Sequence, residues 1–173
     1  MADNPEQFEI AKNENEPIFC YILKNGHIEI HLKSNIRQII KPYINVKQED
    51  MTCDTILHRD IIADNCECEH LLFDVKQRTL PTTYKNFSIK KTCLSFLENR
   101  YNDKKTYYTY NNYYFAFALD DGNKYINEFL VVKGYDVLKL YLNNMCDKYN
   151  EFVCFNENDL RQSDSATIYM SDF

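Results

Sequence analysis

The apolar residues of this chain occur in short runs separated by turn residues, and this arrangement constrains the fold more than any other feature of the sequence. Residues 18–24 and 27–33 are two runs of strand length joined by Asn25-Gly26, the preferred pair for a two-residue hairpin turn. We therefore expect a β-hairpin here. Alternation in its second strand would turn Ile28 toward the core and His27 toward solvent.

Further runs predict the remaining elements. Residues 107–119 and 124–132 flank an Asp-Asp-Gly-Asn turn and indicate a second hairpin, while residues 66–75 and 152–155 have the pattern of single strands. Helical spacing predicts a short helix within residues 34–43 and longer helices over 88–101 and 137–149. Residues 48–65 fit a helix or an ordered loop equally well.

Hairpins and isolated helices without a strand–helix–strand rhythm indicate an α+β fold. A chain of 173 residues with 45% hydrophobic content is long enough for one core. We expect a single domain over residues 17–155, built on a mainly antiparallel sheet of hairpins with two to three helices. Residues 1–16 would form a flexible acidic arm, and residues 156–173 an acidic tail able to add an edge strand.

Cysteine usage and the N-terminus predict a cytoplasmic, reducing location. The seven cysteines are odd in number and irregularly spaced, and the first residues lack the pattern of a secretory signal. No apolar run is long enough to cross a bilayer, so we expect no membrane partner. The abundance of Asn, Lys, Ile and Tyr is typical of an AT-rich genome, which weakens arguments from tyrosine content alone.

One segment has the opposite charge to the rest of the chain. Residues 76–105 carry eight Lys or Arg against two acids, whereas the whole protein has a net charge of −6. Tyrosines follow this segment directly, and basic residues beside aromatic rings are typical of surfaces that neutralise phosphates and stack on bases. The candidate binding residues are Lys85, Lys90, Lys91, Arg100, Lys104, Lys105, Tyr107 and Tyr113. In a strand, alternate rings of the tyrosine run would instead be core.

A group of cysteines and histidines precedes the basic segment. Cys53, His58, Cys66, Cys68 and His70 lie within eighteen residues. If residues 66–70 are extended, Cys66, Cys68 and His70 share one face, and Cys53 or His58 could complete a tetrahedral zinc site. The spacing matches no common zinc motif, and buried cysteines acting as small apolar residues are the simpler interpretation.

The sequence assigns no reaction class, because no catalytic residues can be given named roles and no small-molecule substrate is indicated. We therefore expect a small non-catalytic binding protein whose basic, aromatic-flanked face docks onto RNA or a ribonucleoprotein particle such as the ribosome. One alternative is a protein–protein modulator of the parasite or viral type, which would bind an acidic protein. A second alternative is a metal-dependent enzyme that uses the Cys/His group.

Overall fold

The computed structural model describes residues 5–50, 57–77, 86–119 and 128–171, with side chains from Asn15 onward. Its elements, in chain order, are α1 (Pro5–Asn25), β1 (His27–His31), β2 (Ile36–Ile40), β3 (Ile44–Gln48), β4 (Ile61–Asp64), β5 (His70–Lys76), β6 (Asn86–Lys90), α3 (Lys91–Asn102), α4 (Tyr107–Tyr110), β7 (Tyr113–Ala118), β8 (Glu128–Lys133), α5 (Gly134–Leu142), β9 (Asp147–Tyr149), β10 (Phe152–Asn156), α6 (Glu157–Arg161) and β11 (Thr167–Ser171).

The described strands form two sheets. The large sheet has the order β2-β1-β11-β8-β7-β5-β4-β3, and the small sheet has the order β6-β10-β9. The α+β class expected from the sequence is confirmed. Two details differ: the large sheet is mixed, because β5 and β7 run parallel, and the described part of the chain contains five helices, more than the two to three expected.

The large sheet is curled, and a short connection shows why. β2 and β3 lie at opposite edges of the sheet, yet only residues 41–43 separate them. Eight flat strands would place the edges about 34 Å apart, whereas the link from Ile40 to Ile44 can span at most about 15 Å. The sheet must therefore bend until the end of β2 and the start of β3 are neighbours.

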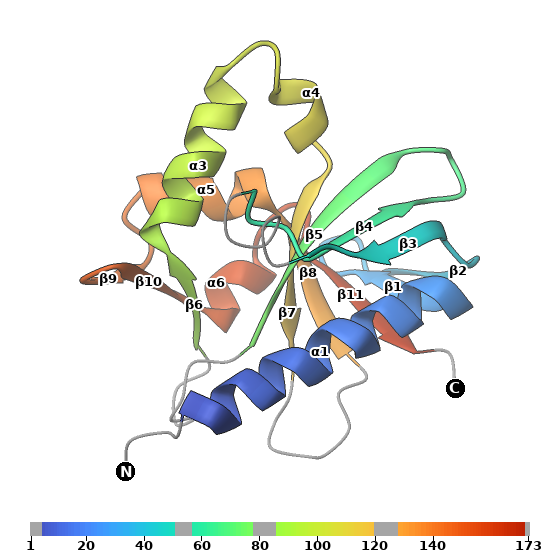
Figure 1. Cartoon of the computed structure of the whole chain (residues 1–173). Helices are drawn as coiled ribbons and strands as arrows, with labels where there is room; N and C mark the ends of the chain where they lie inside the picture. The colour runs from blue at the N-terminus through green and yellow to red at the C-terminus, as the bar shows by residue number, and fades with distance from the viewer. Residues whose placement is uncertain (1–4, 51–56, 78–85, 120–127, 172–173) are drawn as a thin grey trace.

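Each face of the large sheet carries its own hydrophobic core. On one face α1 packs with Phe19, Ile22 and Leu23 against side chains of β4, β5, β7, β8 and β11. On the other face lie α3, α5, α6 and the small sheet. Figure 1 shows α1, in blue, running along one side of the sheet, with α3, α5 and the small sheet gathered on the other.

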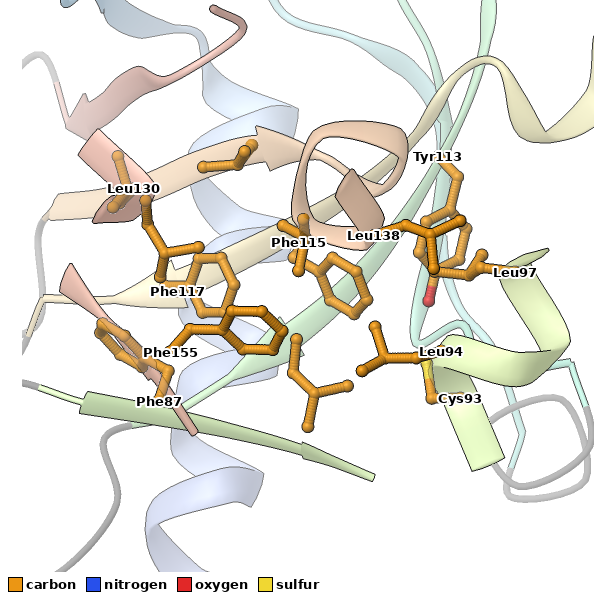
Figure 2. Close-up of a cluster of buried hydrophobic side chains, with 14 of the residues drawn as sticks. Phe87, Cys93, Leu94, Leu97, Tyr113, Phe115, Phe117, Leu130, Leu138 and Phe155 are labelled. Carbon is orange, nitrogen blue, oxygen red and sulfur yellow. The ribbon is translucent and has the colours of Figure 1, made fainter. Parts of the chain in front are cut away.

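Strict alternation along β7 supplies both cores. Tyr113, Phe115 and Phe117 point to the α3 and α5 side, whereas Ala116 and Ala118 point toward α1. Figure 2 shows Phe115 and Phe117 packed among side chains from α3, α5 and the small sheet. The two Phe rings stack with centroids 5.9 Å apart. This apolar run is the centre of the fold because it is buried on both faces.

The first predicted hairpin is wrong in its first strand. Residues 18–24 belong to α1, which begins at Pro5 and so also includes most of the expected N-terminal arm. Phe19, Ile22 and Leu23 have the i, i+3, i+4 spacing of a helix face. Gly26 ends the helix with a φ of +85°, the left-handed conformation that glycine commonly adopts just after a helix. The Asn-Gly pair is thus a helix stop, not a hairpin turn.

His27 is also placed differently from the prediction. Its side chain is fully buried, stacked on Tyr169 with ring centroids 4.6 Å apart. Its Nε2 lies 2.8 Å from Oε2 of Glu29, and the hydroxyl of Tyr43 donates to the same carboxylate oxygen at 3.0 Å. The Glu29 carboxylate and the aromatic neighbours explain how this imidazole can leave solvent.

Of the other predicted helices and strands, some are confirmed and some are wrong. The helix expected within residues 34–43 is instead the strand β2 and the link that follows it, because Asn35 adopts a φ of +57° and reverses the chain after β1. The helix expected over 88–101 is confirmed as α3, which begins at Lys91. The helix expected over 137–149 is the shorter α5, and the strand expected over residues 152–155 is β10. The C-terminal strand β11 lies between β1 and β8, inside the sheet and not at its edge.

None of the helices in the described part of the chain is both long and apolar enough to span a bilayer.

Gly26 provides a test of the junction between α1 and the sheet. A Cβ added at Gly26 would lie 2.9 Å from the backbone oxygen of Ile40, in addition to the cost of a positive φ for an L-residue. We expect Gly26→Ala to lower the free energy of unfolding in urea by about 1–3 kcal/mol. Gln48→Ala, in the exposed edge strand β3, should change it by less than about 0.5 kcal/mol. Equal stability of the two variants would contradict this account of the junction.

Candidate functional site

The basic and aromatic residues singled out from the sequence come together at the corner where α3 ends and α4 begins. α3 stops at Asn102, and Asp103 builds the turn: its carboxylate accepts from the backbone N–H of Lys105 at 2.9 Å, and its backbone oxygen accepts from that of Tyr107 at 3.0 Å. The hydroxyl of Thr106 donates to the backbone oxygen of Arg100 at 2.8 Å. These bonds fix the turn and start α4.

A hollow of about 260 Å³ lies at this corner. We call it the α3–α4 pocket, and its lining residues are Tyr101, Asn102, Lys104, Tyr107 and Tyr108. Tyr108 is 81% exposed and Tyr107 is 43% exposed. They meet edge to face at 5.8 Å between centroids. Two aromatic faces are therefore open to solvent beside the ammonium group of a lysine.

The floor of the pocket is rigidly held. The ring of Tyr101 packs edge to face on Tyr135 of α5 at 5.5 Å and on Tyr107 at 6.5 Å. Burial, with smaller contributions from Asp136 and Tyr114, raises the pKa of Tyr101 above its usual value, so its hydroxyl is neutral at physiological pH. Lys139 extends over the ring of Tyr135 at 5.4 Å and is paired with Asp136, with 3.8 Å between Nζ and Oδ1, so it adds no net charge near this corner.

The predicted binding residues do not form one continuous face. Lys104 and Lys105 are exposed beside the pocket and form no ion pair with any residue that the structure describes. Lys90 and Lys91 lie at the other end of α3, about 17 Å away for a helix of this length. Lys85 falls outside the described residues. The charge excess of the segment is thus divided between two places.

Arg100 and Tyr113 have structural contacts. The guanidinium of Arg100 stands 4.6 Å from the ring centroid of Phe96 and 5.9 Å from that of Tyr110, which ties α3 to α4. Tyr113 is fully buried in β7. The prediction that Tyr113 is a contact residue on the surface is wrong, because the strand begins at this residue and its ring points into the core.

The hydroxyl of Tyr113 belongs to a buried polar group beneath α3. It donates to the backbone oxygen of His58 and to Oδ2 of Asp74, the latter at 3.3 Å. Oδ2 of Asp74 also lies 3.2 Å from Nζ of Lys76. Burial alone would lower the pKa of Lys76, but the neighbouring carboxylate of Asp74 raises it. The Lys76 ammonium is therefore charged at neutral pH, and its ion pair with Asp74 lies within β5. Sγ of Cys93, in the first turn of α3, lies 4.0 Å from the same carboxylate oxygen.

The Cys/His group is not assembled into one site. Cys66 and Cys68 are exposed in the turn between β4 and β5, and Cys68 has a φ of +62°. The predicted extended geometry over residues 66–70 is wrong because the side chain of Asn65 accepts from the backbone N–H groups of residues 67 and 69 and closes a tight turn. β5 begins only at His70.

The remaining members lie elsewhere. Nδ1 of His70 is 2.7 Å from Oδ1 of Asp64, the last residue of β4. The ring of His58, which precedes the start of β4, contacts Phe96 of α3 with centroids 5.1 Å apart. Cys53 falls outside the described residues. Within the part of the chain that the structure covers, no three His, Cys, Asp or Glu side chains are grouped closely enough to hold a metal ion.

Sequence reasoning missed Tyr101, Asn102 and Tyr108. Residues 107–112 were expected to extend the strand that became β7, and an extended strand would have buried every second ring. One signal could have indicated the helical turn α4. Thr106 and Asn111-Asn112 are residue types common at helix ends, and the four residues between them are enough for one helical turn. This turn is what exposes Tyr107 and Tyr108 together.

No family model, curated protein or solved structure matches the chain.

Thiol reactivity tests whether a buried cysteine could act as a nucleophile. Burial, reinforced by Asp74, raises the pKa of Cys93 to about 12, and burial raises that of Cys20 to about 11. At pH 8 these two thiols should stay unmodified by iodoacetamide in the native protein, while the exposed Cys66 and Cys68 react, because only the thiolate attacks. Mass spectrometry of tryptic peptides measures this, and unfolding in urea should make all four equally reactive. Native labelling of Cys93 at the rate of Cys66 would contradict the prediction.

Proposed function

We propose that this protein is a non-catalytic binding protein that docks through the α3–α4 pocket onto RNA, free or within a ribonucleoprotein particle such as the ribosome. The observation that carries the proposal is the pairing of two solvent-open rings, Tyr107 and Tyr108, with Lys104 around one hollow. A nucleotide presents the complementary groups: a flat base and a phosphate.

The chemistry favours an unpaired base. Stacking of a base on an aromatic side chain contributes about 1–3 kcal/mol and tolerates any sequence. In a duplex the bases are already stacked on each other, so a single base can enter a pocket only from a loop, a bulge or a single strand. Tyr108 would offer the outer stacking face, and Lys104 and Lys105 would neutralise the adjoining phosphates.

The charge of the whole protein limits how strongly this site can act alone. A net charge of −6 repels a polyanion at long range, and two unpaired lysines release few counterions on binding. Binding to isolated RNA should therefore be modest and strongly salt-dependent. A ribonucleoprotein particle, which offers protein as well as RNA surfaces, suits such a ligand better than long free RNA does.

The location proposed for this activity is the reducing cytoplasm. The six cysteines in the described part of the chain are all free thiols, which agrees with that compartment. The rival partner, an acidic protein, would be bound by the same basic face.

Charge reversal at the pocket tests the phosphate contacts. We expect Lys104→Glu with Lys105→Glu to weaken binding of a fluorescein-labelled twelve-nucleotide oligouridylate at least tenfold. The slope of log affinity against log salt should fall by about 1.4, because two phosphate contacts are lost on a single strand. Fluorescence anisotropy at several salt concentrations measures both. The same variant should also be lost from the ribosome fraction on sucrose gradients.

The matched control is Lys90→Glu with Lys91→Glu, the same charge change at the far end of α3. We expect it to alter affinity by less than twofold. If it weakens binding as much as the pocket variant does, the contact is a diffuse electrostatic one and the α3–α4 pocket is not the site.

Removing the rings tests the stacking. Tyr107→Ala with Tyr108→Ala should lower the affinity about tenfold or more, the loss expected for one stacked base, with little change in the salt slope. Tyr149→Ala, which removes a ring that is 60% exposed on the small sheet, is the control and should bind as the unaltered protein does. An unchanged affinity in the double variant would rule out base stacking at this corner.

A further inference from the structure

We infer that the free edge of β2 binds an extended acidic peptide segment of another protein, which adds to the large sheet as a further strand. The peptide would carry an acidic, an apolar and a second acidic residue at alternate positions. This surface lies on a different element from the α3–α4 pocket, and the inference does not depend on the proposed function.

β2 is an open edge with regular backbone geometry. It pairs with β1 over five consecutive residue pairs without a shift in register, and its other side has no partner strand in the described sheet. The opposite edge, β3, is interrupted by a register shift between Ile44 and Lys47, the kind of irregularity that protects an edge from pairing. Of the two edges, only β2 presents an unbroken row of backbone donors and acceptors.

The side chains of β2 are unusually apolar for a free edge. Ile39 is 76% exposed and Ile36 is 54% exposed. Their alternation places Ile39 on the same face as Arg37, opposite Ile28 of β1, while Ile36 lies on the α1 face beside a hollow of about 280 Å³. An exposed, regular edge with isoleucines on both faces is the feature that strand addition uses.

Charge decides which partner fits this edge. Residues 30–48 contain four Lys or Arg and no acid, in a protein that is acidic overall. Lys33 is already paired with Asp164, but Arg37 and Lys41 are exposed and form no ion pair with any residue that the structure describes. A second copy of β2 would place these bases against each other, which disfavours self-pairing. An acidic strand removes that repulsion.

The alternation of β2 also gives the order of residues in the partner. Arg37, Ile39 and Lys41 occupy every second position. Lys41 follows the end of β2, but Pro42 favours an extended conformation at Lys41, so we expect the alternation to continue to this residue. A strand laid beside them would place an acid opposite Arg37, an apolar side chain opposite Ile39 and an acid opposite Lys41. This pattern reads the same in both directions, so it holds for a parallel or an antiparallel partner.

A charge-swap experiment on the full-length protein tests the inference. The probe is a fluorescein-labelled peptide containing Glu-Thr-Ile-Thr-Glu, with a Lys-Thr-Ile-Thr-Lys counterpart. We expect the acidic peptide to bind the unaltered protein at least tenfold more tightly than the basic one. The variant Arg37→Glu with Lys41→Glu should reverse this preference. These substitutions lie on an exposed edge, and circular dichroism confirms that the variant is folded.

Three further arms can overturn the inference. The acidic peptide N-methylated at alternate residues should lose binding, because strand addition requires its backbone N–H groups; retained binding would show side-chain contact alone. Vesicles with 30% phosphatidylserine should not co-sediment with the protein, and the chain should remain a monomer in analytical ultracentrifugation. Vesicle binding or dimerisation that Ile39→Lys abolishes would assign this edge to a membrane or to a second copy instead.

The two proposed surfaces can also be separated. Arg37→Glu with Lys41→Glu should leave the affinity for oligouridylate within twofold of the unaltered protein, and Lys104→Glu with Lys105→Glu should leave peptide binding unchanged. If the peptide does not bind, the inference about β2 is wrong, and the proposal of RNA binding is unaffected.

Discussion

The link of three residues between β2 and β3 sets the shape of this protein. Because residues 41–43 must join the two edge strands, the eight-stranded sheet cannot lie flat, and its curled face receives one long helix, α1. The last turn of that helix is fastened to the link: the backbone N–H of Tyr43 donates to the backbone oxygen of Leu23 at 2.8 Å. Gly26 then lets the chain turn directly from α1 into β1. The edge strands are consequently held in fixed positions without being paired to each other.

The candidate RNA-binding corner depends on a second constraint, the close packing beneath it. A Cβ on Gly134 would lie 2.7 Å from Cδ1 of Tyr113 and 3.0 Å from the hydroxyl oxygen of Tyr101, so the start of α5 is pressed against both tyrosines. The hydroxyl of Tyr113 in turn donates a hydrogen bond to Asp74 in the adjacent strand β5. The floor of the α3–α4 pocket is thus continuous with the core, whereas its rim, Tyr107 and Tyr108, projects from a single helical turn. The floor is therefore already ordered before a ligand binds, which lowers the entropy cost of binding at this corner.

Sequence patterns predicted the elements whose signal was purely periodic. The apolar face of α3, the hairpin partners β7 and β8 and the strand β10 were read correctly, because burial alone decides their spacing. The errors share one cause: a local signal with two structural meanings. Asn25-Gly26 fits a hairpin turn and a helix stop equally, and only the packing of Phe19 against the sheet decides between them. The isoleucines of residues 36–40 fit a helix, yet Asn35 turns the chain back along β1. At the site, the lysines were recognisable, whereas the turn that exposes Tyr107 and Tyr108 depends on hydrogen bonds that Asp103 accepts and that Thr106 donates.

The distribution of charge gives both proposed surfaces a common physical basis. In a protein of net charge −6, an exposed Lys or Arg that the fold does not need lowers neither solubility nor stability. Salt screens its charge, so it attracts an anionic ligand only within about 8–10 Å. Lys76, which is paired with Asp74, and Lys33, which is paired with Asp164, are accounted for by intramolecular contacts. Two other pairs of basic residues are exposed next to aromatic or apolar side chains. They are Lys104 and Lys105 beside the pocket, and Arg37 and Lys41 along β2. Each surface therefore combines a short-range electrostatic attraction with a flat or apolar contact. Such a surface is better suited to a ligand held close to it within an assembled particle than to a polyanion free in solution.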